Sequence, residues 1–436
     1  MNRWQAWRAF LIPKLHRVAE FLVAQGITLA GNLLYGLLCV RLLPLAGYAK
    51  FAVVFAYLGS LVVLMDIGIS SSLVPLVGNR VDDRQLIADY VASLRQLAHR
   101  LFAMMAPATA VVFPFLVRKQ AWGWPVVSAM VAILVVAAWC ARVSAAYGAV
   151  LILRRDRKRY YRAQMTTSLG TLSLLVGLWA LHWLNAWTAI LLNVAGIVYV
   201  SQVYFFRARN LLGVHGNPSK QKREAILRLI MPNIPNVLFY AVQGQISLML
   251  ITIFGRTAGV ASVGALGRLA QIFVLLAQMN PLLIEPYFAK LARARLKSTY
   301  LGTLALVGTL SFGAVGLARA FPELFLWVLG PKYSNLRFEV VLVIAAGAIR
   351  HVSGLMWIIH CSRRFVYWWN NVMTIVLTIL VQVVFLWKTD LGTVRSVLIF
   401  NIASALAGLL VNALCGVYGF RQGPRQIEGI CERFQE

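Results

Sequence analysis

RLLPLAGYAKFAVVFAYLGSLVVLMDIGISSSLVP, residues 41–75, joins the end of one apolar helix to a second by a short turn, and it places an acid, Asp66, inside the second. Residues 256–286 repeat this order, with an arginine after an apolar run, a Gly/Ala turn, and a long apolar run that ends at proline. The similarity predicts a chain of two halves that each contain this hairpin.

The composition of the chain excludes a soluble globular domain. Its 436 residues are 60% hydrophobic and only 13% charged, which leaves too little polar surface to cover a core of that size. We therefore expect an all-α polytopic membrane protein. The net charge of +28 lies mostly between the apolar runs, so membrane topology explains it and no nucleic-acid partner is expected. The cysteines form no CxxC or Cys/His grouping, and we expect neither a metal nor a cofactor.

Twelve apolar runs are long enough to cross a bilayer core of about 30 Å. They cover about residues 18–41, 50–75, 99–117, 125–152, 161–183, 186–206, 231–254, 260–288, 299–319, 338–361, 366–387 and 395–420. The N-terminus, the tail and the connections after even-numbered runs hold 29 of the 42 lysines and arginines. The positive-inside rule then places both termini in the cytoplasm.

The longest polar connection lies near the middle of the chain. It predicts an N-terminal six-helix bundle (1–206), a cytoplasmic linker (207–230) and a C-terminal six-helix bundle with a cytoplasmic tail (231–436). Pro232 and Pro235 open the seventh span. Each proline removes an amide donor and kinks a helix, so this pair is the hinge candidate, with a static kink as the alternative.

Three arginines lie deep within the predicted spans. Arg350 is 13 residues from Arg337 and from Arg363, which is about 20 Å along a helix. Arg142 and Arg268 lie 12 residues from their boundary arginines, about 18 Å. A charge at that depth must face protein or water. Because a guanidinium group is a planar fork that suits phosphate, we predict that the three line a central cationic cleft and bind a pyrophosphate or anionic glycan.

The alternative for each arginine is a pairing with an acid or with helix carbonyls that only holds helices together. Deep acids are scarce, and Asp66 is the one that lies clearly within a span. Asp66 is therefore a candidate either for ion coupling or for pairing with one of the arginines.

No catalytic residues are predicted, because the sequence has no HExxH, GxSxG or Ser/His/Asp pattern. A membrane polymerase or ligase of glycan assembly would need a large outer loop, and the longest outer connection, about 319–338, is short. A drug/cation antiporter would be expected to carry deep acids and few deep arginines. A scaffold subunit without transport activity is a third alternative, which the deep arginines disfavour.

Three short motifs carry a family resemblance: AGYAKFAVVF at 46–55, LMDIGISSSLVP at 64–75 and VLGPKYSN at 328–335. With the twelve-span layout, they resemble Wzx-type polysaccharide and O-antigen flippases of the multidrug/oligosaccharidyl-lipid/polysaccharide (MOP) exporter superfamily. The first turn reads GYAK in place of the GYG common in that family. Lipid-II-type flippases are similar too, but commonly have fourteen spans.

The resemblance implies two six-helix bundles around a central cleft and transport by alternating access. The implied cargo is an undecaprenyl-pyrophosphate-linked oligosaccharide, the repeat unit of a surface polysaccharide or exopolysaccharide. It would move from the cytoplasmic to the outer leaflet of the bacterial inner membrane. The expected partners are this lipid-linked oligosaccharide, membrane lipids and other polysaccharide-assembly proteins.

Overall fold

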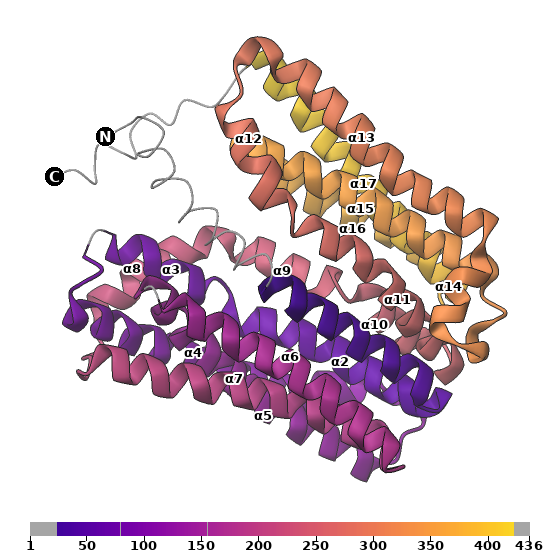
Figure 1. The fold of residues 1–436 in the computed structure, drawn as a ribbon, viewed down its shortest axis with the longest axis horizontal. Coiled ribbons are helices and arrows are strands. Elements are labelled where there is room, and N and C mark those ends of the chain that lie inside the picture. Colours follow the sequence, from indigo (N-terminus) through magenta and orange to yellow (C-terminus); the bar gives the residue numbers. More distant parts are fainter. Residues whose placement is uncertain (1–23, 79, 155, 423–436) are drawn as a thin grey trace, which may run out of the picture. The chain divides into compact units, whose positions relative to one another are not determined.

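The computed structural model describes residues 24–78, 80–154 and 156–422, and their regular structure is helical throughout (Figure 1). The start of the first predicted span and both predicted cytoplasmic termini lie outside the described residues. The packing divides the chain into two units, Met1–Ile253 (unit 1) and Phe254–Glu436 (unit 2).

Unit 1 is built around helix α5. Its helices are residues 24–42, α2 (Leu45–Asp66), α3 (Ile69–Val77), α4 (Arg84–Leu116), α5 (Trp124–Leu153), α6 (Arg157–Ala180), α7 (Ala186–Leu212), α8 (Lys220–Ile230), α9 (Ile234–Gln243) and most of α10 (Ile246–Phe254). Helix α5 contacts α2, α3, α4, α6 and α7. Its second half is rich in alanine, and such small side chains let neighbouring helices approach closely.

The second predicted span is broken between α2 and α3. Ile67 and Gly68 both have left-handed backbone, with φ of 39° and 89°. The carboxylate of Asp66 accepts hydrogen bonds from the backbone N–H of Ser70 at 2.8 Å and from its hydroxyl at 2.7 Å. The Asp-Ile-Gly segment therefore ends one helix and caps the next, since the carboxylate satisfies a free amide of the first turn of α3.

The seventh predicted span is also interrupted. A 3-10 turn at Met231–Asn233 separates α8 from α9. Gly244 and Gln245 then separate α9 from α10. Pro232 and Pro235 lie at the first interruption, where their missing amides are tolerated. The two prolines thus lie at a break in the helix, and its use as a hinge stays a prediction.

The predicted linker, 207–230, contains the end of α7, a loop and helix α8. Helix α8 packs on α4, and Arg223 donates a hydrogen bond to Gln96 at 2.8 Å. Packing places α8 and α9 in unit 1, so the units divide about 23 residues after the predicted linker ends. The assignment of two six-helix halves that meet at this linker stays a prediction.

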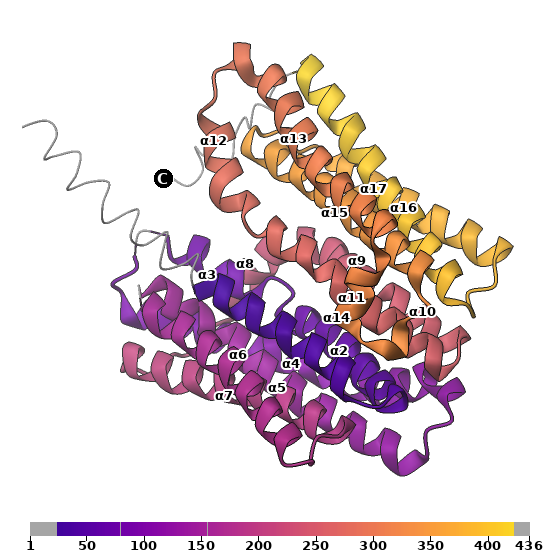
Figure 2. The same cartoon turned by 45° about the vertical axis from the view of Figure 1, so that its right-hand side comes forward.

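Unit 2 is built around helix α15. Its helices are α11 (Thr257–Ala277), a π-helical turn (Asn280–Ile284), α12 (Glu285–Lys290), α13 (Arg293–Ala320), α14 (Pro322–Leu329), α15 (Arg337–Ser362), α16 (Trp368–Lys388) and α17 (Val394–Gln422). Helix α15 contacts α11, α12, α13, α14 and α17, and Figure 2 shows α13, α15, α16 and α17 running along one another.

Ten helical segments of the described residues are long and apolar enough to cross a membrane, so the chain is a multi-pass membrane protein. The other two predicted spans correspond to the helix at 24–42, whose predicted start lies outside the described residues, and to α6. Helix α6 has 24 residues and opens with a cluster of lysine and arginine. The all-helical architecture with about twelve spanning helices agrees with the sequence prediction.

Candidate functional site

Each of the three predicted arginines lies in the interior of a helix. Arg142 belongs to α5 of unit 1, whereas Arg268 of α11 and Arg350 of α15 belong to unit 2. Arg142 and Arg268 are buried, with 7% and 5% of their surface exposed, and Arg350 is exposed on its unit. An exposed charge halfway along a spanning helix must face water or another protein surface, because hydrocarbon would not accept it.

Arg142 is held by two aromatic neighbours. Its Nη1 donates to Nδ1 of His99 on α4 at 2.8 Å, and its guanidinium carbon lies 3.6 Å from the ring centroid of Trp139, one turn earlier on α5. Because an arginine can only donate, His99 accepts at Nδ1 and its ring is neutral. The side chain of Arg142 is thus fixed by stacking and by an uncharged acceptor.

Arg350 also has a neutral partner, because its Nη2 donates to the amide oxygen of Asn401 on α17. The next residue, His351, is turned toward α13, where its Nδ1 lies 3.0 Å from the hydroxyl of Ser311. The two adjacent side chains therefore have separate roles, and His351 links two helices. Asn412 of α17 makes a second polar link to α15, through the carbonyl and hydroxyl of Ser353.

Arg268 is brought near α15 by the packing of its helix. Phe273, on the same helix α11, lies so close to Gly347 of α15 that a Cβ at 347 would come within 2.5 Å of the ring. The glycine allows this approach, and the ring also lies 6.0 Å from that of His351. Unit 2 thus packs together the two helices that carry Arg268 and Arg350.

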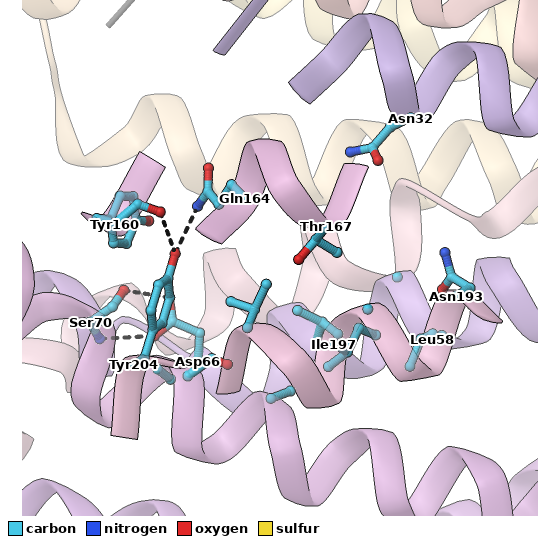
Figure 3. Close-up of a pocket in the computed structure, with 18 of the residues that line it drawn as sticks. Asn32, Leu58, Asp66, Ser70, Tyr160, Gln164, Thr167, Asn193, Ile197 and Tyr204 are labelled. Atoms are coloured by element: carbon cyan, nitrogen blue, oxygen red, sulfur yellow. Dashed lines mark hydrogen bonds between the residues drawn. The ribbon is translucent and has the colours of Figure 1, made fainter. Parts of the chain in front are cut away.

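Unit 1 contains a partly open cavity of about 780 Å³, which the sequence prediction missed (Figure 3). Its wall comes from the helix at 24–42 and from α2, α3, α5, α6 and α7, and Asp66 is the one charged residue among the described residues that line it. Hydroxyl and amide side chains supply the rest of its polar surface; they are Asn32, Tyr35, Ser70, Ser71, Ser144, Tyr160, Gln164, Thr167, Thr171, Asn193 and Tyr204.

One side of the cavity is aromatic. The rings of Tyr160 and Tyr204 stack with centroids 5.0 Å apart and planes 11° apart, and Gly148 leaves room for them against α5. Figure 3 shows the hydroxyl of Tyr204 between Gln164, which donates to it at 3.2 Å, and Tyr160. Flat apolar faces beside amide and hydroxyl groups can bind a ligand that is itself uncharged and rich in hydroxyls.

Other polar groups of this cavity keep unused hydrogen-bonding capacity. The buried hydroxyl of Ser144 has no hydrogen-bond partner among the described residues. Asn193 lies away from the tyrosine pair in Figure 3, and within the described residues it makes no hydrogen bond. Polar residues at helical spacing, such as Gln164, Thr167 and Thr171 within an apolar span, are the sequence signal that could have revealed the cavity.

The carboxylate of Asp66 faces this cavity while it caps α3. Among the described residues its hydrogen bonds go to Ser70, and none of the ion pairs there involves Asp66. In that part of the chain no group of three or more His, Cys, Asp or Glu is placed to hold a metal ion. The roles of Asp66 in ion coupling or pairing stay predictions.

Arg142 does not line the cavity of Asp66. It faces a separate space between α4, α5 and α7, although its neighbours Ala141 and Ser144 line the larger cavity. Unit 1 thus keeps its deep acid and its deep arginine in different cavities.

No protein-family model matches the chain, and no curated protein sequence matches it. Solved structures do match. An inward-facing multidrug resistance MATE transporter of the MOP superfamily has a TM-score of 0.62 and 16% identity, over 92% of this chain and 96% of that one. The lipid II flippase MurJ, in an inward closed conformation, has a TM-score of 0.67 and 11% identity, over 93% and 88%.

A third structure is a MOP superfamily transporter from Pyrococcus furiosus, described as having a binding pocket of reverse polarity that suggests a different function. It has a TM-score of 0.53 and 14% identity, over 93% of this chain and 96% of that one. At these identities the likeness establishes the fold. The chain has the fold of the MOP-superfamily transporters.

Proposed function

We propose that this protein is a flippase that moves a polyprenyl-pyrophosphate-linked oligosaccharide from the cytoplasmic to the outer leaflet of the bacterial inner membrane. The observation that carries the proposal concerns Arg142 and Arg350. Both lie deep in spanning helices, and their hydrogen bonds go to the neutral side chains of His99 and Asn401. These contacts leave the positive charges available to an anion, which a cargo with a pyrophosphate group supplies.

The cavity of unit 1 supports a glycan as part of the cargo. Its volume of about 780 Å³ lies within the range of roughly 300–1,000 Å³ that is usual for ligand sites. Its many hydroxyl and amide groups and the stacked tyrosines suit sugars, whose rings have apolar faces and hydroxyl edges. In this proposal Arg142, Arg268 and Arg350 bind the pyrophosphate, and Pro232 and Pro235 form the hinge of alternating access.

The fold supports transport of this kind, because MurJ is described as a lipid II flippase. The motifs that resemble Wzx-type flippases make a polysaccharide repeat unit the proposed cargo. Both termini would then lie in the cytoplasm, and the partners would be membrane lipids and other polysaccharide-assembly proteins.

A drug/cation antiporter is the second candidate function. It is favoured by one specific observation, the carboxylate of Asp66 in the wall of the large cavity, together with the likeness to a MATE transporter. In that case Asp66 would hold the cation, and the deep arginines would be structural.

Reconstitution of the native protein separates these functions. Proteoliposomes and empty liposomes would be loaded with a fluorescent polyprenyl-pyrophosphate oligosaccharide, and a membrane-impermeant quencher would report the outer-leaflet fraction. In parallel, uptake of a cationic dye would be followed under proton and sodium gradients. The proposal predicts protein-dependent movement of the lipid-linked glycan. Dye transport without glycan movement would establish the antiporter, and movement of neither would refute both candidates.

A further inference from the structure

A second group of basic side chains in unit 1 lies outside the large cavity. A space of about 280 Å³ between α4, α5 and α7 has Arg95 and Arg142 in its wall. A neighbouring space of about 630 Å³ has Arg95 and Arg209 in its wall and reaches the loop after α7. The two spaces are neighbours, because Arg95, Tyr147 and Phe205 line both. We call them together the arginine side pocket.

The arginine side pocket is strongly positive. Among the described residues, no Asp or Glu lines either space. The nearest acid of α4, Asp89, binds Lys222 and the backbone N–H of Asn217, and it is therefore compensated. Within the described residues, Arg95 and Arg209 take part in no ion pair, and both are exposed. Charges gathered in a recess focus the field and attract an anion.

The inner end of the pocket contains an unsatisfied donor. Arg142 is 7% exposed, and its Nη1 is used by His99, but its buried Nε has no hydrogen-bond partner among the described residues. A buried donor of a charged group that lacks a partner is costly to the fold. An anion in the space that Arg142 lines would relieve that cost.

The open end of the pocket, near Arg209, is lined by an ordered loop. The loop from 213 to 219 crosses the start of α4, where a Cβ at Gly216 would come within 1.9 Å of the carbonyl oxygen of Ala88, so only glycine fits. Two hydrogen bonds fasten this loop to α4. The backbone N–H of Asn217 donates to the carboxylate of Asp89, and the side-chain amide of Gln85 donates to the carbonyl of His215. The distribution of lysine and arginine predicts that this end faces the cytoplasm.

We propose that the arginine side pocket is a binding site for a phosphate or pyrophosphate group, which enters at Arg209, passes Arg95 and is held by Arg142. Guanidinium groups bind such oxyanions through paired N–H donors, and three of them in sequence provide a path. The site shares Arg142 with the proposed function but does not require a glycan cargo. The bound phosphate group could come from the headgroup of an anionic lipid or from a soluble phosphate.

Trp139 supplies a local reporter, because the guanidinium group of Arg142 lies on its ring. The purified full-length protein would be titrated with inorganic pyrophosphate while its fluorescence is followed. The same titration of Trp139→Phe assigns the signal, since this variant keeps an aromatic face for Arg142 but removes one of the 13 tryptophans. We expect a saturable change in the native protein that is absent in Trp139→Phe.

The variants Arg95→Gln and Arg209→Gln test the path without disturbing the fold, because both side chains are exposed. Each should weaken pyrophosphate binding about tenfold, the loss of one charge-assisted contact. Arg337→Gln is the matched control, an exposed arginine of unit 2 that pairs with Glu323, and it should bind like the native protein. Native affinity in both pocket variants, or a signal that persists in Trp139→Phe, would overturn the proposal.

Lipid nanodiscs distinguish the two sources. If a headgroup occupies the pocket, nanodiscs with phosphatidylglycerol should change the Trp139 signal and weaken pyrophosphate binding relative to pure phosphatidylcholine. If the source is soluble, both nanodiscs should give the same pyrophosphate affinity. No response to pyrophosphate or to phosphatidylglycerol refutes the site. Binding in a protein that moves no lipid-linked glycan would refute only the proposed function, and transport without binding would refute only this site.

Discussion

At the scale of single residues, the partners of a deep charge decide what it can do. A deep arginine bonded to a carboxylate is neutralised and serves to hold helices together. Arg142 and Arg350 are instead bonded to His99 and Asn401, which orient the guanidinium groups without cancelling their charge. Orientation by neutral partners is the arrangement expected of a preorganised anion site, because the charge is placed before the ligand arrives.

Asp66 contrasts with these arginines, because both of its carboxylate oxygens already accept hydrogen bonds that stabilise the fold. Its two oxygens accept from the N–H and hydroxyl of Ser70, immediately after the left-handed pair Ile67 and Gly68. The sequence signal that marks Asp66 as functional is therefore also the signal of a helix cap. A variant that removes the charge of Asp66 but keeps its hydrogen bond to the start of α3 is therefore needed to show which role matters.

Substitutions of Asp66 should separate these roles in a stability measurement. Asp66→Ala removes the cap of α3 and should lower the unfolding free energy by about 0.5–2 kcal/mol. Asp66→Asn keeps an oxygen that can accept from the amide of Ser70, so it should unfold near the native temperature. Thermal unfolding in detergent measures both. Asp82→Ala is the control, because the side chain of Asp82 is fully exposed and its ion pair with Arg154 is screened by solvent. Equal stability of Asp66→Ala and the native protein would contradict the cap.

At the scale of elements, interrupted helices shape each unit. The helix after each hairpin turn has 22 residues in α2 and 21 in α11, and each is followed by a break, at Ile67–Gly68 and at the π-helical turn after α11. This shared order agrees with the repeat seen in the sequence. Breaks expose backbone groups within a membrane, so they are tolerated where protein or water can satisfy those groups.

The contact between α11 and α15 should be sensitive to one glycine. A Cβ at Gly347 would come within 2.5 Å of Phe273, so Gly347→Ala should force the two helices apart and cost about 1–3 kcal/mol. Gly354 lies on the same helix with nothing within 4 Å of a Cβ, and Gly354→Ala should be neutral or stabilise by about 0.5–1 kcal/mol. Chemical unfolding of the two variants compares them directly. Equal stability of Gly347→Ala and Gly354→Ala would contradict the close contact between Gly347 and Phe273.

Pro232 in the 3-10 turn and Pro235 in the first turn of α9 should affect transport more than stability. Replacing Pro232 and Pro235 by alanine restores two amide donors and favours a continuous helix across the 3-10 turn. If this segment bends during transport, the double variant should fold normally and transport severalfold more slowly. Pro322→Ala is a suitable control, because Pro322 occupies the first position of α14, where proline interrupts nothing. An unchanged transport rate in the double variant would mark the break as a static kink.

At the scale of the whole molecule, hydropathy and charge predict much of the fold. The lengths of the apolar runs correctly predicted an all-helical membrane protein with about twelve spanning helices. The orientation that the distribution of arginine and lysine indicates stays a prediction. The ends of the spans were predicted less accurately. The third predicted span, 99–117, belongs to helix α4, which begins at Arg84 and not near residue 99. The polar turns that precede the apolar run continue the same helix, and hydropathy detects the membrane core and not the helix end.

Features that depend on pairings between distant residues were beyond the sequence. Residues 207–230 appear polar enough for a free linker, yet Lys222 and Arg223 bind Asp89 and Gln96 on α4, so α8 packs within unit 1. Likewise, the depth of Arg142 could be counted along the helix. Its neutral partner and its separation from the cavity of Asp66 depend on the rotation of α5 and on its neighbours, which a single sequence does not report.

The most direct test of the central claim is leaflet-to-leaflet movement of a fluorescent polyprenyl-pyrophosphate oligosaccharide in proteoliposomes. The native protein would be compared with Arg350→Lys, Arg350→Ala and the exposed control Arg337→Ala, all at equal folded amounts. We predict native rates for Arg337→Ala, partial movement for Arg350→Lys, which keeps the charge but loses the fork, and loss of movement for Arg350→Ala. Native rates in both Arg350 variants would contradict the claim that this arginine binds the cargo.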